Sequence, residues 1–180
     1  MSSWCVRRAA EKPATPGRAA PATGALQCCL CRGAAVNWDH SEPHVFPVSP
    51  AAGDIDGLDH TNNAVYVRWC EQAGWSHSVA LGLDLGDYRR LNRAMAIGSA
   101  AYDYLLPTGL GDELLLGTWL VATDGRLTME RRFQLVRAAD GATVMRGRWQ
   151  LVCIEIDSGK PRRMPPEFCA AYLPAVAVNG

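Results

Sequence analysis

Apolar side chains recur at helical spacing over one stretch of the chain, from position 63 to position 81. The apolar positions are Val65, Tyr66, Trp69, Cys70, Ala73, Ala80 and Leu81. Polar or charged side chains stand between them, among them Arg68, Glu71, Gln72 and Ser76. This spacing predicts one long amphipathic helix over 63–81, which Gly82 ends.

Strand-like patterns follow the predicted helix. The four runs are 95–106, 113–122, 127–137 and 143–156. Asp124-Gly125 and Asp140-Gly141 separate the last three runs and favour tight hairpin turns. The last three runs are therefore expected to form an antiparallel meander.

Shorter patterns complete the order of elements. An apolar stretch at 44–48 contains Pro47 and therefore suits the edge of a sheet. A helical turn at 87–91 and a short helix after Pro165-Pro166 are also predicted. This order predicts an α+β fold, in which a curved antiparallel sheet of about five strands wraps around one long central helix.

Some strand runs are apolar on both faces, as at 114–116 and 151–154. The central helix covers one face of such a sheet, so a second subunit is the simplest cover for the remaining apolar surface.

Composition narrows the function classes. The chain has 180 residues, 48% of them hydrophobic and 20% charged, which suits one globular domain. Lysine plus arginine equals aspartate plus glutamate at 18 each, so we expect neither a nucleic-acid nor a membrane-surface partner. No apolar run approaches the about 20 residues of a membrane-spanning helix.

Residues 1–43 are rich in Ala, Pro, Gly and Thr and are predicted to form a disordered tail before a folded domain at 44–180. The arginine-bearing, acid-poor start resembles a transit peptide or an over-extended gene start. The Cys28-Cys29-Leu30-Cys31 cluster lacks a second Cys or His pair, so no metal site is expected.

The cysteines indicate the redox environment in which the protein is expected to work. Their number is seven, an odd count, and Cys70, Cys153 and Cys169 have apolar neighbours. We expect these three to be buried thiols in a reducing cytoplasm.

A motif precedes the predicted helix. From Gly53 to Glu71 the sequence is GDIDGLDHTNNAVYVRWCE, an Asp-x-Asp turn followed by His-x-Asn-Asn-x-x-Tyr. Further along, 104–114 is YLLPTGLGDEL, where a predicted strand leads into a Pro-containing turn. In these motifs and their order, over about 44–172, the chain resembles the acyl-thioesterase branch of the hot dog superfamily, including the 4-hydroxybenzoyl-CoA thioesterase group.

The resemblance implies a site between the subunits of a homodimer or homotetramer, working with water and no metal or organic cofactor. Asp56 matches the carboxylate that relatives use as nucleophile or general base, and the backbone N–H of Asn63 matches the group that faces the thioester carbonyl. His60 and Asn62 match the pair that orients substrate, water or loop.

Two positions depart from the family pattern. Asp59 stands where relatives often have Gly, a mild change because Asp tolerates left-handed backbone angles. Leu58 replaces an active-site Asn of some acyl-carrier-protein thioesterases and argues against their mechanism.

The same assignment has a physical basis. Attack on a thioester places negative charge on the carbonyl oxygen, which free N–H groups at a helix start stabilise. Asp56 can take a proton from water or attack directly. The alternative is that the aspartates of this turn are solvated and that Thr61 or Asn62 merely caps the helix.

Other candidates have two interpretations each. Tyr66 either contacts substrate or packs in the core with its hydroxyl satisfied. Some hot dog thioesterases have a catalytic Glu on this helix, but Glu71 lies on the polar side with Arg68 and Gln72, which favours a solvated or interface residue. Lys160, Arg162 and Arg163 either bind coenzyme A phosphates or form a charged surface loop.

The predicted function is hydrolysis of an acyl-coenzyme A thioester. Two alternatives stay open: release of a fatty or polyketide chain from an acyl-carrier protein, and binding of acyl thioesters without catalysis. The length and headgroup of the acyl substrate are not predicted, because a tunnel between subunits would set them.

Overall fold

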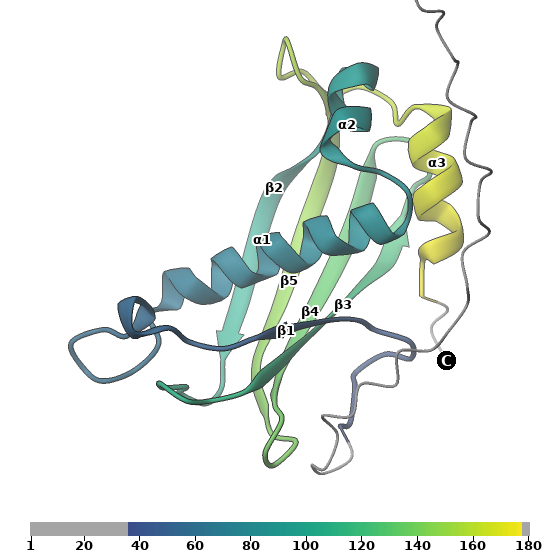
Figure 1. Cartoon of the computed structure of the whole chain (residues 1–180). Helices are drawn as coiled ribbons and strands as arrows, with labels where there is room; N and C mark the ends of the chain where they lie inside the picture. Colours follow the sequence, from purple (N-terminus) through teal and green to yellow (C-terminus); the bar gives the residue numbers. More distant parts are fainter. Residues whose placement is uncertain (1–35, 178–180) are drawn as a thin grey trace, which may run out of the picture.

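The computed structural model describes residues 36–177, which form one antiparallel sheet packed against a long helix (Figure 1). The strand order is β1-β3-β4-β5-β2. The strands are β1 (His44–Val48), β2 (Arg93–Tyr104), β3 (Leu114–Thr123), β4 (Thr128–Arg137) and β5 (Thr143–Glu155). Strand β1 therefore lies at one edge, as its proline predicted, and β2 lies at the other.

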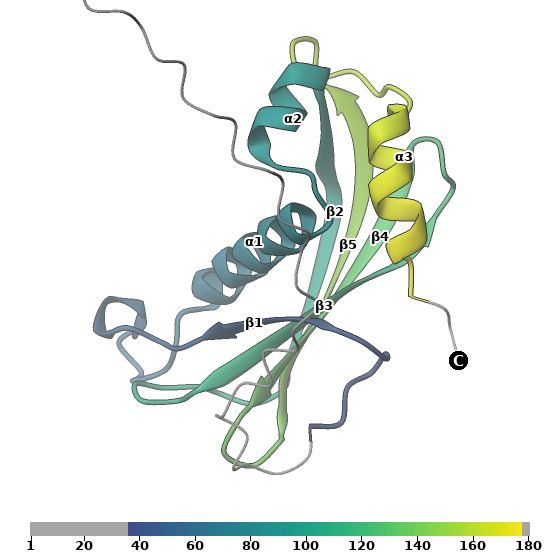
Figure 2. The ribbon, with the colours of Figure 1, turned by 45° about the vertical axis from the view of Figure 1, so that its right-hand side comes forward.

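Helix α1 (Asn63–Ala80) crosses the face of the sheet that curls around it (Figure 2). Its buried side chains, among them Val65, Trp69 and Ala73, pack on inward-facing strand residues such as Leu116 and Phe133. These positions keep apolar surface from water, which is the main favourable contribution to folding. The predicted 63–81 helix and the curved sheet are confirmed.

The last three strands form the predicted meander, β3-β4-β5, with every neighbouring pair antiparallel. Gly125 (φ +66°) and Gly141 (φ +72°) adopt left-handed angles in the two connecting turns. Only glycine takes such angles at little cost, so the Asp-Gly pairs locate these turns from sequence.

Two short helices close one end of the molecule. Helix α2 (Leu85–Leu91) follows α1, and α3 (Pro166–Tyr172) lies beside the C-terminal end of α1 (Figures 1 and 2). The Tyr172 hydroxyl donates to Ser78 Oγ of α1 at 3.0 Å. Two single turns, η1 (Ala52–Asp54) and η2 (Leu173–Ala175), complete the elements of the described chain.

The segment before β1 packs on the outer face of the sheet. Arg146 donates to both carboxylate oxygens of Asp39 at 2.6 and 2.8 Å, and the ring of Trp38 meets Trp119 edge-on. These contacts explain why 36–43, assigned to the tail by the sequence prediction, pack against the domain. The rest of the predicted tail and the Cys28–Cys31 cluster lie outside the described residues.

Cys70 and Cys153 are buried free thiols, as predicted, and Cys169 is a partly buried free thiol. Burial raises the pKa of Cys153 to about 11. No helix between residues 36 and 177 combines the length and apolar character needed to cross a membrane.

Candidate active site

The loop before α1 is folded around the Asp56 carboxylate. Its Oδ1 accepts from the backbone N–H of Leu58 at 2.8 Å and of His60 at 3.3 Å. The Asp56 N–H donates to the His60 carbonyl at 2.8 Å, and Asp59 takes a left-handed φ of 60°. Asp56 therefore both shapes its loop through one oxygen and, in the described chain, keeps the other free of hydrogen bonds.

The start of α1 lies directly behind this loop. Asn62 is the N-cap residue, and its side-chain oxygen accepts from the Ala64 N–H at 2.9 Å. Asn63 is the first helical residue, so its N–H has no acceptor within α1 and points out of the helix end. This free donor carries the partial positive charge of the helix N-terminus.

A cavity of about 260 Å³ joins the two groups. Its walls come from the Asp56 loop, the first turn of α1 and the end of β2 with the turn that follows. The lining residues are Asp56, His60, Thr61, Asn63, Tyr66, Tyr104, Leu105, Leu106 and Pro107. The four predicted residues Asp56, His60, Asn63 and Tyr66 thus face one space, whereas Asn62 is used as the helix cap.

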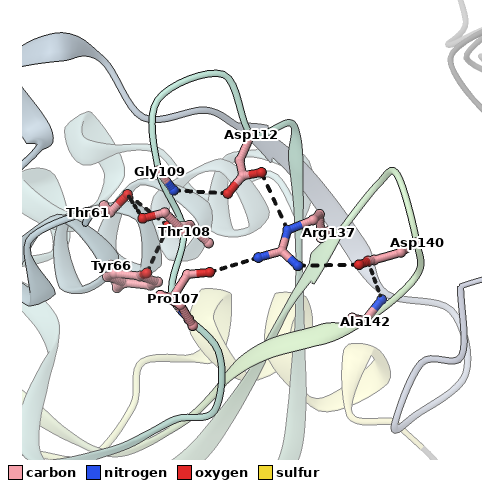
Figure 3. A network of polar contacts seen from close by, with 9 residues as sticks. All are labelled: Thr61, Tyr66, Pro107, Thr108, Gly109, Asp112, Arg137, Asp140 and Ala142. Carbon is pink, nitrogen blue, oxygen red and sulfur yellow. Dashed lines mark hydrogen bonds and ion pairs between the residues drawn. The ribbon is translucent and has the colours of Figure 1, made fainter. Parts of the chain in front are cut away.

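A hydroxyl network supports the cavity from behind (Figure 3). Thr108 Oγ1 lies 2.8 Å from both the Tyr66 hydroxyl and Thr61 Oγ1. The Thr61 N–H donates to the Thr108 carbonyl at 2.8 Å. Tyr66 therefore lines the cavity with its ring, but its hydroxyl is already bonded to Thr108.

Arg137 fixes the same turn from the sheet (Figure 3). It donates to the Pro107 carbonyl at 2.7 Å and pairs with Asp112 at 3.4 Å and Asp140 at 3.3 Å. Sequence reasoning missed Thr61, Thr108 and Arg137 as supports of the site, although Thr108 lies inside the second motif.

Asp54, the first aspartate of the motif, has a structural role. Its carboxylate accepts from the Ala51 N–H at 3.0 Å and pairs with Arg68 of α1. These two bonds, the backbone one first, hold the pKa of Asp54 below its ordinary value. Asp54 therefore tethers the loop to the helix and is absent from the cavity lining.

The predicted coenzyme A residues lie elsewhere in the chain. Lys160, Arg162 and Arg163 are exposed on the loop between β5 and α3. That loop adjoins Glu155, which pairs with Arg93 at the start of β2. The cavity is lined by Tyr104 at the other end of this strand, whose full length Figure 1 shows. A strand of this length spans roughly 35 Å, so one chain alone does not bring the two sites together.

No group of three or more His, Cys, Asp or Glu side chains that could hold a metal ion occurs among residues 36–177. The chemistry available at the cavity is that of a carboxylate, an imidazole and backbone donors.

A family model described as the thioesterase-like superfamily matches residues 50–172, more than half of the chain. The chain belongs to this superfamily. The match includes the Asp56 loop, α1 and the whole meander. It agrees with the predicted enzyme class, a thioester hydrolase.

One curated relative is Protein THEM6 of Danio rerio, 34% identical over 89 residues. The match covers 49% of this chain and 43% of that protein, so the chain spans less than half the length of this relative.

Solved structures share the architecture. A 1,4-dihydroxy-2-naphthoyl-CoA thioesterase from Synechocystis superposes with a TM-score of 0.66 at 18% identity, covering 73% of this chain and 96% of that one. A Staphylococcus aureus protein solved in complex with CoA gives 0.69 at 16% identity, covering 80% and 92%. These likenesses confirm the predicted hot dog fold.

Proposed function

We propose that this protein hydrolyses the thioester of an acyl-coenzyme A at the cavity between Asp56 and Asn63. The observation that carries the proposal is that the Asp56 carboxylate and the first N–H of α1 border the same space. A thioester carbon held there would have a base on one side and an oxyanion donor on the other.

Two routes are open to Asp56. As general base it takes a proton from water while the water oxygen bonds to the thioester carbon, and the oxyanion that forms accepts from the Asn63 N–H. When the carbonyl reforms, the carbon–sulfur bond breaks and coenzyme A leaves as a thiolate, which takes up a proton. As nucleophile, an Asp56 oxygen bonds to the thioester carbon, the carbon–sulfur bond breaks and the coenzyme A thiolate leaves and takes up a proton. Water then opens the mixed anhydride in a second step, which gives the free acid and restores the Asp56 carboxylate.

His60 has a positioning role in this proposal. Its backbone closes the Asp56 loop through two hydrogen bonds, and its side chain lines the cavity. An imidazole in this place can orient the attacking water or the leaving thiolate.

The proposed assembly is a homodimer that pairs β2 with the partner's β2. Within residues 36–177, strand β2 is bonded only to β5, and its residues from Ile97 to Ala101 are exposed. Antiparallel pairing across a two-fold axis puts the end of one β2 beside the start of the other. The basic loop of the partner subunit then approaches this chain's cavity, where it can bind coenzyme A phosphates.

The test is release of free thiol from a panel of acyl-coenzyme A substrates. We expect Asp56→Asn to lower kcat by about 10²- to 10⁴-fold, the usual contribution of a positioned base. Asp59→Asn is the matched control, because Asp59 lies on the same loop, is exposed and has a left-handed φ that Asn tolerates.

Equal rates for wild type and Asp56→Asn would contradict this site. Wild-type protein that binds acyl-coenzyme A but releases no thiol would instead be the non-catalytic binder. Turnover of one acyl group on coenzyme A and on a carrier protein separates the remaining alternative, since only coenzyme A offers its nucleotide phosphates to the basic loop.

A further inference from the structure

A second cavity, of about 240 Å³, lies under the C-terminal half of α1. Its more exposed lining residues, Glu71, Trp75 and Ile97, mark the mouth at the β2 edge. Its fully enclosed residues include Arg131 of β4 and Tyr172 of α3, which mark the inner end. The proposed mechanism uses none of these five side chains.

Arg131 is a buried cation without a counter-ion in the described chain. Only 3% of the residue is exposed, and no carboxylate between residues 36 and 177 forms an ion pair with it. Burial lowers the pKa of Arg131 to about 10, so it stays protonated at neutral pH. A buried charge in this situation favours any anion that can reach it.

The partners that Arg131 does have are neutral. One guanidinium nitrogen donates to His77 Nδ1 at 3.0 Å and to Thr118 Oγ1 at 3.3 Å. Burial, together with the charge of Arg131 and the neighbouring His44, lowers the pKa of His77 to about 3. His77 is therefore an uncharged acceptor that orients the guanidinium but leaves its charge unbalanced.

Around Arg131 the sheet side of the cavity is apolar. The other polar lining residues are Glu71 at the mouth and Ser78, Tyr88 and Tyr172, whose hydroxyls are hydrogen-bonded to one another. Met129, Trp149 and Leu151 line the sheet side. Gly74 of α1 stands over them, and a Cβ there would lie 3.4 Å from the Trp149 ring and 3.9 Å from Arg131 Nε. Larger side chains at position 74 would fill the space above the guanidinium. The cavity thus suits an apolar group that ends in a negative charge.

The mouth of this cavity faces the proposed partner. Because β2 pairs antiparallel with its copy, the partner's thioester cavity, at the end of its β2, lies beside Met95 and Ile97 near the start of this one. The acyl group of a thioester bound at the partner's oxyanion donor can extend into this cavity. Its carbonyl end then lies outside the cavity and its far end inside.

We propose that this cavity receives the far end of the acyl group and that Arg131 binds a carboxylate there. The inference rests on the proposed function and adds its substrate class: thioesters whose acyl group carries a second, terminal carboxylate. A guanidinium is suited to this, since its N–H groups match carboxylate oxygens in geometry and charge.

Paired substrates of equal length test the selectivity. We expect wild-type protein to hydrolyse adipoyl-CoA and suberoyl-CoA with kcat/KM at least 10-fold above hexanoyl-CoA and octanoyl-CoA. R131M should remove or reverse this preference. R132M is the matched control, because Arg132 is adjacent on β4, faces the other side of the sheet and pairs with Glu130. It should keep the wild-type preference.

Equal or higher wild-type kcat/KM for the methyl-ended substrates would overturn the inference while leaving the proposed function intact. A preference for the carboxylate-ended substrates that R131M retains would also overturn the inference and leave the proposed function intact. If R131M does not fold, R131K, which retains the positive charge, is assayed beside the wild type. The wild-type ratio of kcat/KM between carboxylate-ended and methyl-ended substrates then decides the outcome.

A binding experiment is independent of turnover. Calorimetric titration compares hexanoate with hexanamide, which differ in charge but little in shape. We expect wild-type protein and R132M to bind hexanoate at least 10-fold more tightly than hexanamide and R131M to lose the difference. If no acyl-coenzyme A is hydrolysed, the proposed function fails, and this titration alone confirms or refutes the Arg131 carboxylate site.

Discussion

Some carboxylates of this protein, such as Asp56 and Asp124, stabilise turns through backbone N–H groups. Asp124, in the turn between β3 and β4, accepts from the N–H groups of Arg126, Leu127 and Thr128 at 2.9, 2.7 and 2.9 Å. The bonds from Leu127 and Thr128, the largest causes, hold the pKa of Asp124 well below its ordinary value. The ionised form is therefore the one that stabilises the turn.

Asp124→Asn should lower the melting temperature at pH 7. The folded-state pKa of Asp124 is depressed, so its contribution is present above the unfolded-state value of about 3.9 and is lost as pH falls below it. The difference in melting temperature between wild type and variant should shrink below about pH 4. Scanning calorimetry across pH 3–7 measures this, and a difference that grows on acidification would contradict it.

At the level of one element, α1 depends on the residue that precedes it. Asn62 was predicted as a substrate-binding residue, and the structure uses its side chain to cap the helix. The cap fixes the first turn, whose free N–H at Asn63 faces the cavity. A fraying helix start would misplace that donor relative to a thioester carbonyl.

Asn62→Ala should therefore cost about 1 kcal/mol of unfolding free energy, as for other N-caps. It should also reduce kcat for thiol release, whereas Asn62→Asp, which keeps a side-chain acceptor, should retain both. Urea denaturation and the thiol assay on the same preparations measure the two effects. A stable Asn62→Ala protein with raised KM alone would favour direct substrate contact.

Sequence patterns predicted the elements well where burial follows a regular period. The 3.6-residue period gave α1, and Asp-Gly turns between alternating runs gave the meander, because both depend on neighbours in the chain. The packing of 36–43 was not predicted, since it relies on Trp38 and Asp39 meeting residues about 80 to 110 positions away.

The two cavities differ in the same way, because one is built around a local motif and the other is built from distant elements. Asp56, His60 and Asn63 share a short motif, and their common cavity could be predicted from it. The Arg131 cavity is lined by residues of six separate elements, so no local pattern predicts it. One signal was available: in β4 the inward positions Met129, Phe133 and Leu135 are apolar and Arg131 interrupts them.

For the whole molecule, the exposed edge of β2 is the edge at which the proposed dimer would pair. Ala100 lies near the middle of this strand and is exposed. A small side chain here allows a second strand to approach closely. In the part of the chain that the structure describes, the outer edge of this twelve-residue strand is unpaired, and proteins seldom leave such a long edge without cover.

Ala100→Glu should convert the dimer into a monomer, because two like charges would face each other near the two-fold axis. Light scattering after size-exclusion chromatography should give half the wild-type mass, and thiol release should fall with it. Ala122→Glu, the same change at an exposed position of β3, is the control and should leave the mass unchanged. A dimeric Ala100→Glu protein would refute β2 pairing.

The two cavities sit at opposite ends of β2, so each working centre would draw its base from one chain and its guanidinium from the other. A mixed dimer of Asp56→Asn and Arg131→Met chains would then contain one centre with both groups intact and one with neither. The first variant alone should be inactive and the second unselective. When the two are unfolded and refolded together, the mixture should regain part of the selective activity.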